Sequence, residues 1–179
     1  MMTNAKYSWP YSRKTEPRGK ILFDALKPFL NKGDTILDVD CGYSPLAKHL
    51  LENGYSITGF DVSQIPILYL KRTHPNGNWI TMEDAEAQFK NYSVLLLLGI
   101  TTPLYTVYSQ TYFETTERLL KLNRPRLILA ESANGADQKL YQQICVLLNN
   151  QHYYLNKEGG YDAEMIRASK RHYSMWVQP

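Results

Sequence analysis

The sequence predicts an α/β protein, a three-layer sandwich in which a mostly parallel, seven-stranded sheet lies between two layers of helices. Two observations favour this fold. Short apolar segments alternate about five times with longer amphipathic segments along the 179 residues, and such alternation is typical of parallel sheets with helices on both faces. The segment 92–98 ends in five consecutive apolar residues, as expected for a strand that is covered on both faces.

The elements expected in the first half follow from capping residues and apolar periodicity. A helix over 15–31 would be capped by Thr15, hold Pro17 in its first turn and end at the stop signal that includes Gly33. A second helix, over 44–52, has Ser44 as its N-cap and Pro45 in its first turn. The remaining expected elements are strands over 35–39, 55–60 and 79–82 and a helix over 63–72.

The second half continues the alternation and then changes character. Its expected elements are a strand over 92–98, a helix over 103–122 whose continuity is open near Ser109, a strand over 126–130 and a helix over 137–149. The last two strand-like segments, 152–156 and 173–177, are separated by a polar stretch. We expect them to pair as an antiparallel hairpin at the sheet edge, with a long connection that holds at most one helical turn.

The composition is that of a globular chain and excludes several classes of protein. Hydrophobic residues make up 44% and charged residues 21%, which excludes a disordered chain. The longest apolar run, at 94–100, is far shorter than the ~20 residues of a membrane span. Cys41 and Cys145 are too few for a disulfide framework. With no apolar signal segment at the start, we expect a cytoplasmic protein with free thiols.

The chain is expected to form one domain over residues 15–179, preceded by a tail or lid over residues 1–14. Tyr7, Trp9 and Tyr11 suit either a lid over a ligand or an anchor against the body. The net charge is +3, but the first 33 residues carry seven basic and two acidic side chains. Such a segment is typical either of a solvated surface or of a contact with a nucleic acid or anionic substrate.

Ligands of such sheets bind outside the carboxyl ends of the strands, near the point where the strand order reverses. That places the expected site at Asp38–Ser44, Asp61, Asp84 and Gly99–Pro103, which follow the first four strands. Three acids at consecutive strand ends suit a nucleoside cofactor, because carboxylates accept hydrogen bonds from a ribose diol and an exocyclic amine. The helix after Ser44 would offer amide groups to a ligand carboxylate.

The stretch Ile36–Ser63 resembles the cofactor-binding half of class I S-adenosylmethionine-dependent methyltransferases. That family has an acid and a glycine-rich turn after its first strand, and a second acid at the end of its second strand. Here Asp38 opens the turn, Gly42 is its remaining glycine and Asp61 closes the second strand. The segment 81–85 resembles the acidic motif of the third strand, and the order of elements extends the resemblance over residues 15–178.

The resemblance implies an enzyme that uses S-adenosylmethionine and releases S-adenosylhomocysteine. The cofactor-binding residues that it implies are Asp38, Asp40, Gly42, Asp61, Val62, Asp84, Ala85 and Gly99. No catalytic residue is implied, because positioning and desolvation are the main tasks of a protein that transfers a sulfonium methyl group. The four histidines lack metal-ligand spacing, so we expect no metal.

Two residues of the turn depart from the family pattern. The family usually reads acid-x-Gly-x-Gly-x-Gly, and here Asp40 and Ser44 stand at two of the glycine positions. The Ser44 hydroxyl suits a helix cap. The Asp40 carboxylate would either hold the ammonium group of the cofactor or repel its carboxylate and weaken binding. The alternative to an enzyme is therefore a degenerate binding module that acts through a partner.

A nicotinamide-dependent reductase is a weaker alternative, because the turn lacks the G-x-G-x-x-G spacing. The acceptor is not defined by the sequence. The segment 102–105 only partly resembles the Asn/Asp-Pro-Pro-aromatic motif of nitrogen methyltransferases. A small molecule is slightly favoured over RNA, since the basic excess is modest. Glu131 and Ser132 are candidates to face the acceptor. Cys41 is a candidate for a lowered thiol pKa, although packing is the favoured role.

Overall fold

The computed structural model describes residues 15–81, 91–98, 106–133, 138–163 and 169–179. The elements in chain order are α1 (Thr15–Leu26), the 3-10 helix η2 (Lys27–Phe29), β1 (Thr35–Val39), α2 (Ala47–Glu52), β2 (Ser56–Asp61), α3 (Gln64–Thr73), β3 (Asn78–Thr81), β4 (Val94–Leu97), α5 (Thr106–Asn123), β5 (Leu127–Ala133), α6 (Gln138–Asn150), β6 (Tyr154–Ala163) and β7 (Ser169–Val177).

Seven strands form a single mixed sheet in the order β3-β2-β1-β4-β5-β7-β6. The first five strands pair in parallel, and β7 is antiparallel to both β5 and β6. This arrangement confirms the predicted sheet and its antiparallel hairpin at the edge. Because β2 flanks β1 on one side and β4 flanks it on the other, the strand order reverses beside β1.

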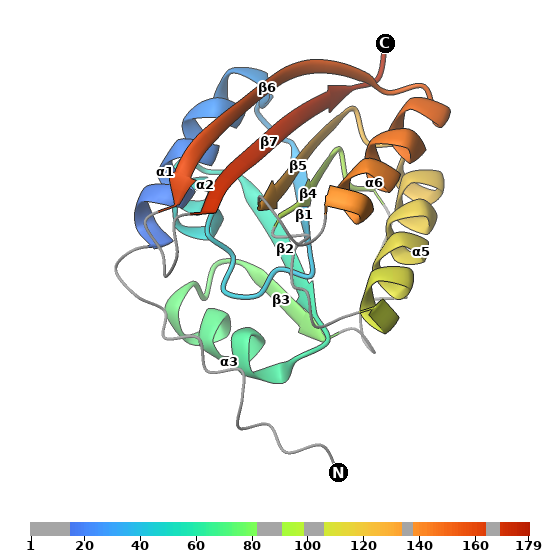
Figure 1. Ribbon diagram of the computed structural model, residues 1–179. Helices are drawn as coiled ribbons and strands as arrows, with labels where there is room; N and C mark the ends of the chain where they lie inside the picture. Colours follow the sequence, from blue (N-terminus) through green and yellow to red (C-terminus); the bar gives the residue numbers. More distant parts are fainter. Residues whose placement is uncertain (1–14, 82–90, 99–105, 134–137, 164–168) are drawn as a thin grey trace.

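Helices cover both faces of the sheet, with α1, α2 and α3 on one face and α5 and α6 on the other (Figure 1). Successive side chains of a strand point to opposite faces. Ile36 and Leu96 therefore belong to the core under the first set of helices, whereas Leu37 and Leu95 belong to the core under the second. β4 is buried throughout, and β1 is buried except at Thr35, which explains the continuous apolar run in β4.

The first helix ends earlier than predicted. The α-helix stops at Leu26 and continues as a 3-10 turn to Phe29, because Pro28 has no N–H to donate and disfavours helical backbone at the preceding residue. Near its other end the helix approaches the start of α2 closely. A Cβ atom built on Gly19 would lie 2.1 Å from the carbonyl oxygen of Pro45, so this contact requires glycine.

The second helix begins at Ala47, three residues later than predicted. Ser44 is not its N-cap, because the N-cap residue is Leu46 and no side chain caps the helix. Ser44 has a φ of +44°, which lies outside the right-handed helical region. Ser44 and Pro45 instead belong to the turn before the helix, where the Ser44 carbonyl accepts a hydrogen bond from the Ala47 amide.

The C-terminal hairpin is longer than predicted, and the expected long connection was wrong. Both strands continue through the polar stretch to Ala163 and from Ser169. The extension escaped the sequence analysis because its side chains up to Gly160 are mostly exposed, so no apolar alternation marks it. Helix α5 runs without a break through Ser109. In the parts of the chain that are described, no helix has the length and apolar character needed to cross a membrane.

Candidate functional site

The turn after β1 has left-handed backbone at every second residue. The φ angles are +53° at Asp40, +50° at Gly42 and +44° at Ser44. These are the three positions at which the turn of class I methyltransferases usually has glycine. Side chains on L-residues rarely adopt this conformation, although aspartate tolerates it better than most. The turn therefore keeps a glycine-type backbone although two of its three left-handed residues carry side chains.

Asp38, at the end of β1, is completely buried beneath this turn. Its Oδ2 atom accepts a hydrogen bond of 2.6 Å from the Ser44 hydroxyl, and its Oδ1 atom has no partner among the described residues. Burial raises the pKa of Asp38 to about 7, although the Ser44 hydrogen bond and the charge of Arg18 act to lower it. A buried carboxyl oxygen without a described partner is unusual in a folded protein.

Asp61, at the end of β2, ties the turn to the neighbouring strand. Its Oδ2 atom accepts from the Gly42 amide at 2.8 Å, and its Oδ1 atom accepts from the Ser63 amide at 2.7 Å. The Cys41 amide extends the same connection by donating to the Phe60 carbonyl at 2.9 Å. The adjacent acid predicted from sequence therefore lies directly beside the turn, with both oxygens in use.

The carboxyl groups of Asp40 and Asp61 influence each other's protonation, because the charge of Asp61 acts to raise the pKa of Asp40. Asp40 is exposed to solvent, and desolvation by the groups around it, followed by the charge of Asp61, raises the pKa of its carboxyl group to about 7. Burial also raises the pKa of Asp61, against the hydrogen bonds from Ser63 and Gly42.

The geometry fits a small cationic ligand with hydrogen-bond donors. A Cβ atom built on Gly42 would meet no atom within 4 Å, so the turn faces open space there. Asp61 contacts the turn through the Gly42 amide, and Asp38 contacts it through the Ser44 hydroxyl. Within the described ranges, no three His, Cys, Asp or Glu side chains converge as a metal site would require.

Comparisons with solved structures identify the architecture. A TehB-like S-adenosylmethionine-dependent methyltransferase from Corynebacterium glutamicum aligns with 94% of this chain and 89% of its own, at 15% identity and a TM-score of 0.65. Magnesium protoporphyrin IX methyltransferase from Synechocystis PCC 6803, with bound S-adenosylmethionine, aligns with 93% of this chain and 80% of its own, at 16% identity and a TM-score of 0.68. The chain has the class I methyltransferase fold.

That fold also occurs in an RNA-modifying enzyme among the similar structures. The tRNA (uracil-54, C5)-methyltransferase of Pyrococcus abyssi, in complex with S-adenosyl-L-homocysteine, aligns with 89% of this chain at 16% identity and a TM-score of 0.63. This chain corresponds to 38% of that enzyme. No protein-family model matches the sequence, and no curated protein matches it either. At these identities the likeness establishes the class I methyltransferase fold and leaves the activity to the site.

The structure brings together most of the predicted site residues that it describes. Asp38, Asp40, Gly42 and Asp61 meet at the carboxyl ends of β1 and β2, and Val62 follows with half of its surface exposed. The other predicted residues, Asp84, Ala85 and Gly99, lie outside the described residues, as do the 1–14 segment and the 102–105 motif.

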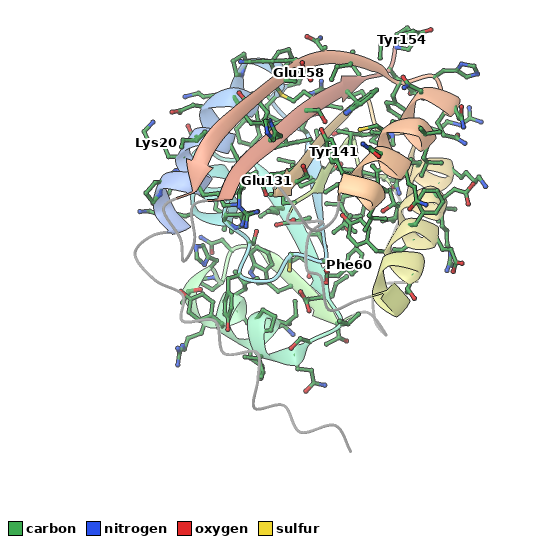
Figure 2. The ribbon with its side chains drawn as sticks, in the orientation of Figure 1. Lys20, Phe60, Glu131, Tyr141, Tyr154 and Glu158 are labelled. Carbon is green, nitrogen blue, oxygen red and sulfur yellow. The ribbon has the colours of Figure 1, made fainter. Side chains whose placement is uncertain are left out.

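Glu131, predicted as a candidate to face the acceptor, is instead held in a buried ion-pair cluster. Its side chain has no exposed surface, and the Arg18 Nε atom donates to its Oε1 atom at 3.0 Å. Arg18 Nη2 and Arg171 Nη1 both bind Oε2, the latter at 3.3 Å. Figure 2 shows Glu131 in the interior, whereas Glu158 lies on the outer strand β6. Glu131 therefore joins α1, β5 and β7 and is unsuited to act as a general base.

Two further residues at the site were missed by the sequence analysis. Arg18 lies close enough to Asp38 for its charge to lower the pKa of that carboxyl group. Tyr112, on α5, has a buried hydroxyl group without a partner among the described residues, and burial and the charges of Asp40 and Asp38 raise its pKa. Neither residue belongs to a local motif, because both reach the site from distant helices.

The structure does not give Cys41 the lowered thiol pKa for which the sequence made it a candidate. Its thiol is buried, and burial together with the charges of Asp38, Asp61 and Asp40 raises the thiol pKa well above its ordinary value. The expected lowering by a helix N-terminus is wrong, because α2 begins six residues later and three carboxyl groups lie nearby. A neutral buried thiol is consistent with the packing role that the sequence favoured.

Proposed function

We propose that this protein is an S-adenosylmethionine-dependent methyltransferase. The observation that carries the proposal is the turn from Asp38 to Ser44, whose three left-handed residues stand at the glycine positions of the family turn and whose Gly42 faces open space. The class I methyltransferase fold and the presence of S-adenosylmethionine or S-adenosylhomocysteine in similar structures support it. When bound, S-adenosylmethionine supplies a methyl group made electrophilic by its sulfonium centre.

The residues of this chain would divide the binding of the cofactor among them. Asp61 would accept hydrogen bonds from the ribose hydroxyls through the lone pairs that its two amide donors leave unused. Asp38 and Asp40 would accept from the ammonium group, because Asp38 has an orphaned oxygen and Asp40 borders the same turn. Val62 would pack against the adenine ring, with Asp84, Ala85 and Gly99 completing the pocket as the sequence predicts.

We propose a small-molecule acceptor in preference to RNA. Part of the basic excess that suggested a nucleic acid is consumed within the protein, because Arg18 is turned inward to Glu131 and Lys20 pairs with Asp24 at 2.6 Å. Phosphate recognition needs several exposed basic side chains on one face. Lys27 and Lys32 are exposed, and Lys6, Arg13 and Lys14 lie outside the described residues.

Calorimetric titration with S-adenosylmethionine and S-adenosylhomocysteine tests the cofactor, and transfer of a tritiated methyl group tests the acceptor. The expected results are binding that Asp61→Ala abolishes, and incorporation of label into a protein-free small-molecule extract but not into total RNA. Label in RNA would overturn the acceptor assignment alone. Failure of both ligands to bind would overturn the cofactor, and restoration of binding by Asp40→Gly would favour the degenerate binding module instead.

A further inference from the structure

We propose that the methyl acceptor carries an anionic oxygen group, a carboxylate or a phosphate, and that Arg171 near the start of β7 binds this group while the methyl group goes to another atom of the acceptor. The inference rests on the proposed function and names the chemical class of its acceptor. It is carried by the way in which Arg18, Glu131 and Arg171 meet at the edge of the sheet where the site lies.

Strands β5 and β7 extend beyond their neighbour at this edge of the sheet. β4 ends at Leu97, which pairs with Ala130 on β5. β5 continues to Ala133, which pairs with Arg171 on β7. Alternate residues of a strand share a face, so Glu131 and Ala133 both lie on the face that α1 covers. The two strands therefore border the space beyond the carboxyl end of β4, with Arg171 on the side of α1.

The position of this pair of strands suits an acceptor that lies next to the cofactor. Neighbouring strands lie about 4.8 Å apart, so β5 and β7 are roughly 10 and 14 Å from β1, the strand that leads into the turn. Helix α1 connects the two regions, because Gly19 packs against the Pro45 carbonyl and the preceding residue, Arg18, reaches Glu131. A small molecule of ordinary size would therefore reach from the cofactor to Arg171.

Arg171 is incompletely paired with the carboxylate that it shares. Arg18 binds both oxygens of Glu131, through Nε at 3.0 Å and through Nη2. Arg171 Nη1 donates to Oε2 at 3.3 Å, which is longer than the about 2.7–2.9 Å typical of charge-assisted hydrogen bonds. The Nε atom of Arg171 is buried and has no acceptor among the described residues. Two guanidinium groups therefore share one carboxylate, and Arg171 has donors that the described residues do not use.

These properties fit an anionic oxygen group better than a neutral one. A guanidinium presents its donors in a planar fork that matches the oxygens of a carboxylate or a phosphate. The Arg171 side chain is 22% exposed, so a ligand can contact it, while the bond to Glu131 fixes its orientation. An uncharged acceptor would leave the charge of Arg171 with a carboxylate that Arg18 already binds through both oxygens.

Transfer of a tritiated methyl group from S-adenosylmethionine to a protein-free small-molecule extract tests the class of acceptor. The intact chain is incubated with both, and the products are separated at pH 8 on an anion exchanger, which retains anions and passes unreacted S-adenosylmethionine. We expect the incorporated label in the retained fraction. Treatment of that fraction with phosphatase distinguishes the two sources of charge, because a labelled phosphate ester would change its retention and a labelled carboxylate would not.

Replacement of Arg171 tests the residue itself. With limiting extract, Arg171→Gln should lower incorporation at least about tenfold, as expected for the loss of a hydrogen bond to a charged group. The affinity for S-adenosylhomocysteine, measured by calorimetry, should stay unchanged. Arg171→Lys keeps the charge without the fork and should recover part of the incorporation; it also serves if the glutamine variant does not fold, with circular dichroism as the check. Arg72→Gln removes an exposed arginine in the last turn of α3 and should change neither quantity.

The outcomes separate this inference from the proposed function. Failure of S-adenosylhomocysteine to bind the unaltered chain would overturn the proposed function and the inference with it. Binding of S-adenosylhomocysteine without label in the retained fraction would overturn the anionic acceptor and leave the cofactor assignment standing. Retained label that Arg171→Gln does not reduce would show that Arg171 does not bind the anion. A parallel loss of S-adenosylhomocysteine affinity in that variant would contradict a role confined to the acceptor.

Discussion

The Ser44 hydroxyl donates a 2.6 Å hydrogen bond to Asp38 Oδ2, across the turn that leaves β1. Sequence reasoning assigned this hydroxyl to the cap of the following helix, and the structure uses it to hold a buried carboxyl group instead. The bond links the strand that carries the acid to the last left-handed residue of the turn, so the shape of the turn and the position of Asp38 depend on each other.

Replacement of Ser44 separates this hydrogen bond from backbone strain. Ser44→Ala removes the donor and should lower the free energy of unfolding by about 1–3 kcal/mol, because the buried Asp38 loses its described partner. Ser44→Gly removes the same donor but relieves the left-handed conformation, which costs an L-residue roughly 1 kcal/mol. In urea unfolding, the unaltered protein should therefore be the most stable, Ser44→Gly less stable and Ser44→Ala the least stable. Equal stability of serine and alanine would show that the bond contributes nothing.

Asp40→Gly should stabilise the protein, and more so at higher pH. In the folded chain the pKa of Asp40 is raised to about 7 from an ordinary value of 3.8. A raised folded pKa favours folding at low pH, and this contribution is lost as the pH rises from about 4 to 7. Asp40→Gly does not lose this stability as the pH rises. The difference in free energy of unfolding between the variant and the unaltered protein should therefore grow between pH 5 and pH 8. A constant advantage would indicate relief of backbone strain alone.

The Glu131 cluster should be important for stability. Glu131→Ala leaves Arg18 and Arg171 without their shared carboxylate in a buried setting, and we expect a loss of about 3–5 kcal/mol. Asp24→Ala is the matched control, because it breaks an exposed pair with Lys20 and should cost less than about 1 kcal/mol. Similar losses in the two variants would contradict the structural role of Glu131.

Gly19→Ala should disturb the contact between α1 and the turn before α2. The added methyl group would lie 2.1 Å from the Pro45 carbonyl oxygen, so the helix must move away. Because α1 also carries Arg18, we expect both a lower melting temperature and a weaker affinity for S-adenosylmethionine. Lys20→Ala, one residue later on an exposed position, should lower the melting temperature much less and leave the affinity unchanged. An unchanged melting temperature for Gly19→Ala would contradict the close approach.

Both cysteines should react slowly with thiol reagents at neutral pH. Burial raises the thiol pKa of Cys41 well above its ordinary value, and burial raises that of Cys145 as well. Only the thiolate is nucleophilic. Cys145 is less buried and should react first with Ellman's reagent, with Cys41 reacting after unfolding in urea. Rapid reaction of Cys41 in the folded protein would show that its thiol is ionised.

The sequence was sufficient to predict a mostly parallel sheet with an antiparallel C-terminal hairpin, because short apolar segments mark the strands of the core. The run at 94–97 and the acids at Asp38 and Asp61 identified the parallel sheet and the edge where the site lies. What was missed depends on contacts between distant segments. Arg18 and Tyr112 come from separate helices, and the arginine partners of Glu131 are distant in sequence, so no local pattern connects them.

The predicted bounds of an element were wrong where a side chain suited two different structures. Ser44 suited a helix cap, but the buried Asp38 takes its hydroxyl. The polar residues of β6 looked like a loop, because a strand at the sheet edge needs no apolar alternation when its side chains are exposed. Tertiary contacts decided both cases, and a single sequence does not record them.

The most direct test of the cofactor site is amide chemical-shift mapping of the labelled chain during titration with S-adenosylhomocysteine. The account predicts that the largest shifts occur at Gly42 and Ser63, whose amides donate to Asp61, and along the turn from Asp38 to Ser44. Shifts concentrated instead in the groove between α5 and α6, around Phe113 and Val146, or no shifts at millimolar ligand, would contradict it.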